Sequence, residues 1–138
     1  MNSVTQKIIE DAYRLEKKYG VKFTVSDYGK KTEGNLKGYP DKPLTAQQID
    51  MLCRSHPRNL KVLTGEISGC IAVDVDRDDQ VSYYLARIDE DTFRVKTKRG
   101  YGWLFAWQAG LDFTKLDLAD DTEVMGNRLT RTVSGRHP

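Results

Sequence analysis

Two acidic side chains stand at the end of one apolar stretch of the chain. Residues 69–75 read Gly-Cys-Ile-Ala-Val-Asp-Val, and a second aspartate follows at position 76. A short β-branched run bounded by turn residues predicts a buried strand, and residues two apart on a strand share a face, with Cα atoms roughly 6.6 Å apart. Asp74 and Asp76 therefore point the same way, which is costly unless a cation lies between them. A hard divalent ion such as magnesium, which prefers oxygen ligands, meets that requirement.

The acidic pair also has a structural interpretation. Aspartates at strand ends often cap turns or helices, and Asp76 is a candidate N-cap for a helix that starts near Asp78. The continuous apolar run before the pair and the basic, glycine-containing segment after it favour the metal-site interpretation.

Basic and aromatic residues follow on a predicted hairpin. Two strands, at 92–97 and 102–107, are joined by Lys-Arg-Gly-Tyr at 98–101, which is typical of a β-hairpin. Glycine in such a turn lets the backbone approach a ligand closely, and lysine and arginine there can neutralise phosphates. The candidate binding residues of the hairpin are Lys96, Lys98, Arg99 and Tyr101.

A third acidic side chain, Glu123, lies on a predicted strand at 122–125, and basic residues follow it. Carboxylates that hold divalent ions, beside cations that hold phosphates, are the groups that phosphoryl or nucleotidyl transfer needs. No one of the three segments is specific, but their order and spacing are. The basic residues after Glu123 are Arg128, Arg131, Arg136 and His137.

The elements that must position these residues follow from periodicity and capping. Helices are predicted at 4–18, 45–54 and 79–89. Strands are predicted at 21–25, on either side of the glycine turn within 61–76, and at 92–97, 102–107, 122–125 and 129–133. Ser3 and Thr45 are the predicted N-caps, and Gly20 ends the first helix. The excess of hairpins over crossovers predicts an α+β domain with a mainly antiparallel sheet and helices packed against one face.

Some side chains are assigned to the interior rather than to a site. The second helix is predicted to bury Ile49, Leu52 and Cys53 on one face. Trp103 alternates with two further aromatic residues on its strand, which favours core packing over base stacking. His56, at a helix end beside a proline, is interpreted as structural.

Length and composition bound the class of protein. The 138 residues suit a single domain spanning 1–138, and the abrupt end at 134–138 suggests a truncated or minimal version of a longer chain. A net charge of +2 means that nucleic-acid affinity must come from local clusters of lysine and arginine. No apolar stretch has the length of a membrane span, and no signal peptide is evident. Cys53 and Cys70 fit reduced thiols of a cytoplasmic protein.

Taken in order, these segments resemble the primase-polymerase domain of the archaeo-eukaryotic primase superfamily, which is found in plasmid, phage and viral replication proteins. Residues 59–76 resemble its first motif, in which a strand and a TG…SG turn lead to an apolar strand ending in Asp-x-Asp. Residues 95–105 resemble the second motif. Residues 123–126, with the segment at 134–138, resemble the third. The resemblance covers about 38–138.

The resemblance implies an RRM-related core and metal-dependent primase or DNA polymerase activity. Asp74, Asp76 and Glu123 would hold Mg²⁺ or Mn²⁺. The partners implied are nucleoside triphosphates, a single-stranded DNA template or primer, and a helicase domain or subunit. The family's second-motif histidine, which contacts the phosphate of the incoming nucleotide, falls on Gly102. The nucleotide-binding residues implied are Lys96, Lys98, Arg99, Tyr101, Arg136 and His137.

Two other functions stay open at this point. Gly102 and the short C-terminal end favour a module that keeps the fold and binds single-stranded nucleic acid without catalysis. An apolar strand ending in Asp-x-Asp also occurs in phosphatases of the haloacid dehalogenase type, with Asp120 and Asp121 as the later acidic pair. The position of Asp74 in the middle of the chain, and Asp78 where that class has threonine or valine, argue against the phosphatase. A calcium-loop interpretation of 74–79 fails because the turn glycine and the bidentate glutamate are missing.

Overall fold

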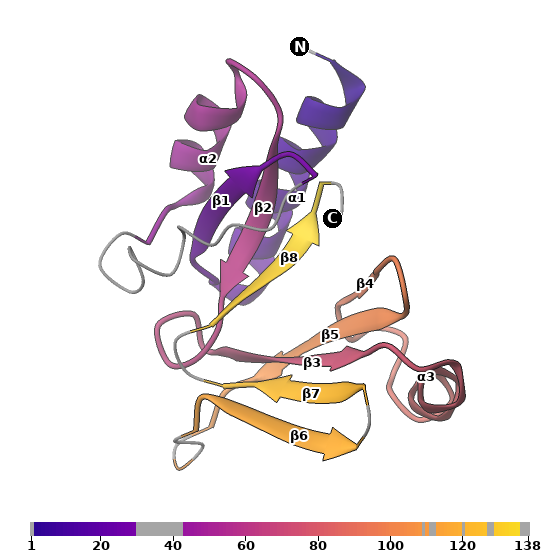
Figure 1. The fold of residues 1–138 in the computed structure, drawn as a ribbon. Helices are drawn as coiled ribbons and strands as arrows, with labels where there is room; N and C mark the ends of the chain where they lie inside the picture. The colour runs from indigo at the N-terminus through magenta and orange to yellow at the C-terminus, as the bar shows by residue number, and fades with distance from the viewer. Residues whose placement is uncertain are drawn as a thin grey trace.

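A computed structural model describes residues 2–29, 43–108, 110, 113–119, 121–126 and 129–135. Within these ranges the strands form two antiparallel sheets, with helices packed on them (Figure 1). The helices are α1 (Ser3–Tyr19), α2 (Ala46–Cys53) and α3 (Asp78–Leu85). The strands are β1 (Phe23–Asp27), β2 (Arg58–Leu63), β3 (Cys70–Val75), β4 (Arg94–Lys96), β5 (Tyr101–Ala106), β6 (Lys115–Ala119), β7 (Thr122–Met125) and β8 (Thr130–Ser134).

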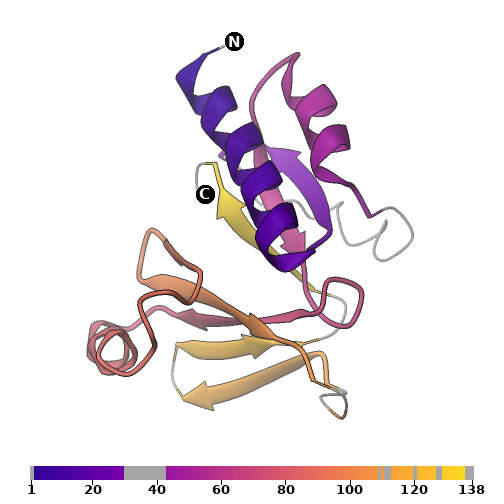
Figure 2. The same ribbon diagram turned by 180° about the vertical axis from the view of Figure 1, so that it is seen from behind.

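The three-stranded sheet has the order β1-β2-β8, and α1 and α2 cover one of its faces (Figure 2). Helix α1 begins one residue earlier than expected, because the side chain of Asn2, not Ser3, accepts a hydrogen bond from the N–H of Thr5 at 2.8 Å. Asparagine caps at least as well as serine. The predicted end at Gly20 is confirmed, since this glycine adopts φ 68° and its N–H donates to the carbonyl of Glu16.

Helix α2 shows the predicted cap and a different buried face. Thr45 and Gln48 form a reciprocal capping box, in which each side chain bonds the backbone of the other residue. The buried side chains are Ala46, Ile49 and Cys53, whereas Leu52 is exposed. The expectation that Leu52 joins the core was therefore wrong, because the helix turns its 46/49/53 stripe toward the sheet.

The five-stranded sheet has the order β4-β5-β3-β7-β6, so β3 is its central strand. Helix α3 packs on one face of this sheet, where Val81 and the half-buried Tyr84 contact a cluster that includes Trp103 and Val73. Trp103 is 1% exposed, which confirms its assignment to the core.

The α+β class and the antiparallel pairing are confirmed, but a single sheet was expected and two are present. The strands on either side of the glycine turn, β2 and β3, lie in different sheets. Gly65 and Gly69 in the connection between them have φ of 104° and 67°, which favours glycine. The last strand, β8, returns to pair with β2, and the backbone N–H and hydroxyl of Thr64 donate to the carbonyl of Leu129 at 2.8 and 3.1 Å.

One apolar core joins the two sheets. Ala72 of β3 and Leu104 of β5 belong to the same buried cluster as Ile8 and Leu15 of α1 and Val133 of β8. The face of the five-stranded sheet that carries Ala72 and Leu104 therefore looks toward the three-stranded sheet. No helix within the described part of the chain is long and apolar enough to cross a membrane.

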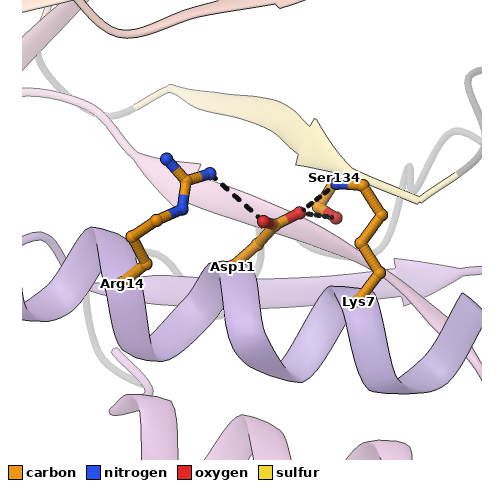
Figure 3. Close-up of polar contacts among 4 residues, drawn as sticks. All are labelled: Lys7, Asp11, Arg14 and Ser134. Carbon is orange, nitrogen blue, oxygen red and sulfur yellow. Dashed lines mark hydrogen bonds and ion pairs between the residues drawn. The ribbon is translucent and has the colours of Figure 1, made fainter.

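Strand β8 is also tied to α1 by a buried carboxylate (Figure 3). Asp11 accepts a hydrogen bond of 2.6 Å from the hydroxyl of Ser134, and it pairs with Lys7 at 2.7 Å and Arg14 at 3.1 Å. Burial by itself would raise the pKa of Asp11, but the hydrogen bonds from Lys7, Ser134 and Arg14 outweigh it and hold the pKa below its usual value. This contact fixes the position of β8, which carries a residue of the candidate site.

Candidate metal and phosphate site

Three acidic side chains form a row on the five-stranded sheet, from its central strand β3 through β7 to the edge strand β6. On the central strand, Asp74 lies directly opposite Glu123 of β7, and Glu123 lies opposite Asp117 of β6. Directly opposite residues of an antiparallel pair share a face, with Cβ atoms about 5 Å apart. The fold thus brings together Asp74 and Glu123, as predicted, and adds Asp117, which sequence reasoning missed.

Asp76 lies just beyond the end of β3, close to this row. Its backbone N–H donates to the carbonyl of Asp121 at 2.8 Å. The alternative role for Asp76 as a helix cap was wrong, because Arg77 is the N-cap residue of α3 and makes no side-chain capping bond. The row lies on the face that looks toward the three-stranded sheet, since Asp74 shares a strand face with Ala72 of the common core.

The environment of Asp74 raises the pKa of its carboxyl group. The side chain of Asp74 is only 15% exposed, and burial raises its pKa to about 6. The guanidinium of Arg131 lowers this pKa, while the charges of Asp76 and Glu123 raise it further. The cross-strand pairing of Asp74 with Glu123 and the position of Asp76 two residues after Asp74 bring the three predicted metal ligands, from two distant parts of the chain, near one another.

Two basic side chains balance the acidic row. The Nε atom of Arg131 on β8 lies 2.7 Å from Oδ1 of Asp74, so the pair joins the two sheets. The Nζ atom of Lys115 lies 3.0 Å from Oε1 of Glu123, which raises the pKa of Lys115. In the described ranges, no group of three or more His, Cys, Asp and Glu side chains has an arrangement that could hold a metal ion. Within these ranges, two of the three predicted ligands pair with cations of the chain itself.

The arginine pair with Asp74 depends on Gly102. This glycine lies opposite Asp74 on β5. A Cβ atom at position 102 would lie 2.7 Å from Nη2 and 2.8 Å from Nε of Arg131, and 3.1 Å from Oδ1 of Asp74. Gly102 was expected to leave the site without a charge at this point. Instead, the space above it is filled by the guanidinium of Arg131.

One atom of this pair has unused hydrogen-bonding capacity. Nε of Arg131 and Oδ1 of Asp74 contact each other as an ion pair, whereas the buried Nη2 atom of Arg131 forms no hydrogen bond within the part of the chain that the structure describes. Buried polar atoms without hydrogen-bond partners are uncommon and indicate a ligand, an ion or water. Carboxylate oxygens are the ligands that Mg²⁺ and Mn²⁺ prefer, so the donor types fit such an ion, and the described side chains would have to exchange their ion-pair partners to coordinate it.

The hairpin residues are divided between two faces of the sheet. Arg99 is exposed and its Nη2 lies 3.8 Å from Oδ1 of Asp121, at the end of the sheet where Asp76 lies. Lys98 is an exposed turn residue beside it. Lys96 and Tyr101 are paired on the opposite face, where the Lys96 ammonium lies 5.2 Å from the Tyr101 ring centre.

The expectation that Lys96 and Tyr101 line the same site as the carboxylates is therefore not supported. Tyr101 lies opposite Val75, and neighbouring residues on a strand point to opposite faces. Its ring packs 5.8 Å from that of Trp103, on the side of the sheet that α3 covers. The remaining predicted residues, Arg136 and His137, lie outside the described residues, as do Arg128 and Asp120.

Sequence reasoning gave no role to Lys115 and Asp117, and it named Arg131 only as one of the basic residues that follow Glu123. Lys115 and Asp117 alternate with leucines on β6, so a period-2 pattern in this segment was the available signal. The pairing of Arg131 with Asp74 had no such signal, because the two residues lie on strands of different sheets.

No protein-family model matches the chain, and no curated protein or solved structure is found to match it.

Proposed function

We propose that the chain is a metal-dependent nucleotidyltransferase domain of the primase-polymerase type, built on a primase-like, RRM-related core. The observation that carries the proposal is the direct cross-strand placement of Asp74 and Glu123, with Asp76 beside them. Arg131 and Lys115 pair with Asp74 and Glu123, and a divalent cation can take their place because it concentrates more positive charge between the carboxylates.

Mg²⁺ or Mn²⁺ is the proposed cofactor, with Asp74, Asp76 and Glu123 as its ligands. When bound, such an ion neutralises the negative charge of a nucleotide's phosphates and lowers the pKa of an attacking hydroxyl. Arg99 and Lys98 lie exposed at the same end of the sheet, where their charges can hold a triphosphate. The proposed partners are nucleoside triphosphates, a single-stranded DNA template or primer and a helicase domain or subunit, and the proposed location is the cytoplasm.

Replacing both strand-end aspartates should abolish activity. Asp74→Ala with Asp76→Ala removes two of the three proposed ligands, so we expect no Mn²⁺-dependent incorporation of labelled deoxynucleotides on a primed single-stranded template. The matched control is Asp89→Ala with Asp91→Ala, which has the same spacing but lies in an exposed turn after α3. Incorporation by the first double variant at the rate of the control would exclude these aspartates from catalysis.

A second candidate is a module that binds single-stranded nucleic acid without catalysis. It is favoured by the ion pairs from Arg131 and Lys115, which already neutralise Asp74 and Glu123. The same preparation distinguishes the two functions. Salt-dependent binding of a single-stranded oligonucleotide by the wild-type protein, together with no incorporation at any Mn²⁺ concentration, would support the module.

A further inference from the structure

Arg131 is placed unlike a surface cation. Its side chain is 11% exposed, and it extends from β8 of one sheet to the acidic row of the other. It lies above Gly102, where any side chain at position 102 would collide with it. A guanidinium carries five N–H donors in a planar fork. Its Nε contacts Asp74, while its buried Nη2 has no acceptor among the described residues.

An unsatisfied guanidinium nitrogen beside carboxylates indicates the kind of ligand that completes the site. A buried donor without an acceptor costs free energy that a ligand oxygen can recover. The ligand must bring negatively charged oxygens, since a guanidinium pairs best with carboxylate or phosphate. It must also tolerate three neighbouring carboxylates, which a free anion does poorly and an anion complexed with a divalent cation does well.

We infer that Arg131 is the phosphate-binding residue of this site, and that it exchanges Asp74 for a substrate phosphate when a divalent ion binds the acidic row. The inference rests on the proposed function for its substrate, a nucleoside triphosphate. Gly102 is required for this exchange, because only glycine leaves room for the guanidinium of Arg131 beside Asp74. Arg131 therefore has two states, counter-ion of Asp74 without metal and phosphate ligand with it.

The two states predict effects of opposite sign when the guanidinium is removed. Arg131→Gln eliminates a cation that competes for Asp74, so the affinity for Mn²⁺ alone should stay the same or increase. The same variant loses charge-assisted bonds to phosphate, so the affinity for the magnesium complex of inorganic tripolyphosphate should fall roughly tenfold to a hundredfold. A residue that only stabilises the fold would not separate these two affinities.

The experiment measures Mn²⁺ binding by electron paramagnetic resonance and magnesium tripolyphosphate binding by calorimetry, with thermal unfolding as a check of folding. Arg94→Gln is the matched control, because Arg94 is an exposed strand arginine that lies opposite Trp103 and over the Tyr101 ring. This control should leave both affinities unchanged. Arg131→Lys, which keeps a point charge without the fork, should restore only part of the tripolyphosphate affinity.

A second variant keeps the test valid if Arg131→Gln does not fold. Gly102→Ala leaves the arginine in the chain but fills the space it occupies, and the displaced group is the flexible end of a side chain. We expect the same loss of tripolyphosphate affinity with Mn²⁺ affinity retained. Tripolyphosphate affinity equal to wild type in both folded variants, or a parallel fall in both affinities, would overturn the inference.

The same measurements distinguish a failure of the proposed function from a failure of the role of Arg131. A wild-type protein that binds no Mn²⁺ would refute the metal site. It would also refute the exchange at Arg131, because that exchange requires a bound divalent ion. A wild-type protein that binds Mn²⁺ and magnesium tripolyphosphate but incorporates no nucleotide would refute the proposed function alone, and the two affinities of Arg131→Gln would still decide the role of Arg131.

Discussion

Gly100 and Gly102, two residues apart at the start of β5, are required for different reasons. Neither glycine has a positive φ, so each position requires glycine because a Cβ atom would not fit, and not because of an unusual backbone conformation. At position 102 the neighbouring atoms belong to a movable arginine side chain. At position 100 a Cβ atom would overlap the backbone carbonyl of Val75 and touch the Cα of Asp76. The first glycine thus fixes how closely the hairpin turn approaches the acidic strand end.

Gly100→Ala should destabilise the protein more than a glycine replacement whose cost is conformational alone. Backbone atoms cannot move aside cheaply, so we expect a loss of about 3 kcal/mol in the free energy of unfolding. Gly20→Ala is the control, since Gly20 has φ 68° and open space around its Cβ position, and it should cost about 1 kcal/mol. Urea unfolding measures both, and an equal cost would mean that the turn does not pack against β3.

At the scale of elements, contacts with β2 and with α1 hold β8 in position. Its backbone pairs with β2, and Ser134 bonds the buried carboxylate of Asp11 on α1. Arg131, three residues earlier on the same strand, reaches Asp74. The strand therefore links the first helix of the chain to the acidic row of the five-stranded sheet.

The contribution of Asp11 should depend on pH in a defined direction. Its pKa in the folded protein is lowered below the usual 3.8, so its stabilising effect is present above that value and is lost as the pH falls through the folded pKa. At neutral pH, Asp11→Asn should cost about 1 kcal/mol, discounted because Lys7 and Arg14 are largely exposed.

The measurement is urea unfolding of wild type and Asp11→Asn at several pH values from neutral to about 3, below the reference pKa of an aspartate. The difference between the two proteins should shrink below pH 3.8, the unfolded value of this carboxyl group. Ser134→Ala removes one partner and should reduce the pH-dependent difference without abolishing it. A difference that stays constant with pH would show that the charge of Asp11 is not what stabilises β8.

The elements were largely predictable from the sequence, but their pairing was not. The bounds of β7 are those predicted, and the hairpin, the Thr45 cap and the Gly20 helix end follow from local periodicity and capping chemistry. These signals act within a few residues. The assignment of β2 and β3 to different sheets depends on pairing with strands far along the chain, for which no local pattern exists.

The candidate site divides in the same way. The strand-end position of Asp74 and Asp76 could be predicted, because alternation on one strand is a local property. The partner of Asp74 could not, since Arg131 comes from the other sheet. The face on which Tyr101 lies was also missed, because the register of β5 against β3 decides it.

At the scale of the whole molecule, one core holds both sheets together. Cys70, Ala72 and Leu104 of the five-stranded sheet are buried in the same cluster as residues of α1, α2 and the three-stranded sheet. The acidic row lies where this shared interface ends. Its geometry therefore depends on the relative position of the two sheets as well as on each sheet alone.

Leu104→Ala should destabilise the whole protein as one unit. Leu104 is 7% exposed in the shared core, so we expect a loss of about 3 kcal/mol with a single transition. Fluorescence of Trp103 and Trp107, on and just after β5, reports on the five-stranded sheet, and far-ultraviolet circular dichroism reports mostly on α1 and α2. Ile71→Ala, on the other face of β3, is the comparison variant. Separate midpoints for the two signals would mean that the sheets unfold independently.

The chain leaves the three-stranded sheet and re-enters it at a single point, where Thr64 bonds the carbonyl of Leu129. Because β2 and β8 are adjacent on either side of that point, the five-stranded sheet is a nested insert whose two ends meet. Changes in the length or sequence of a loop inside such an insert leave the pairing of β2 with β8 in place. The three-stranded sheet should therefore tolerate loop replacements in the five-stranded sheet.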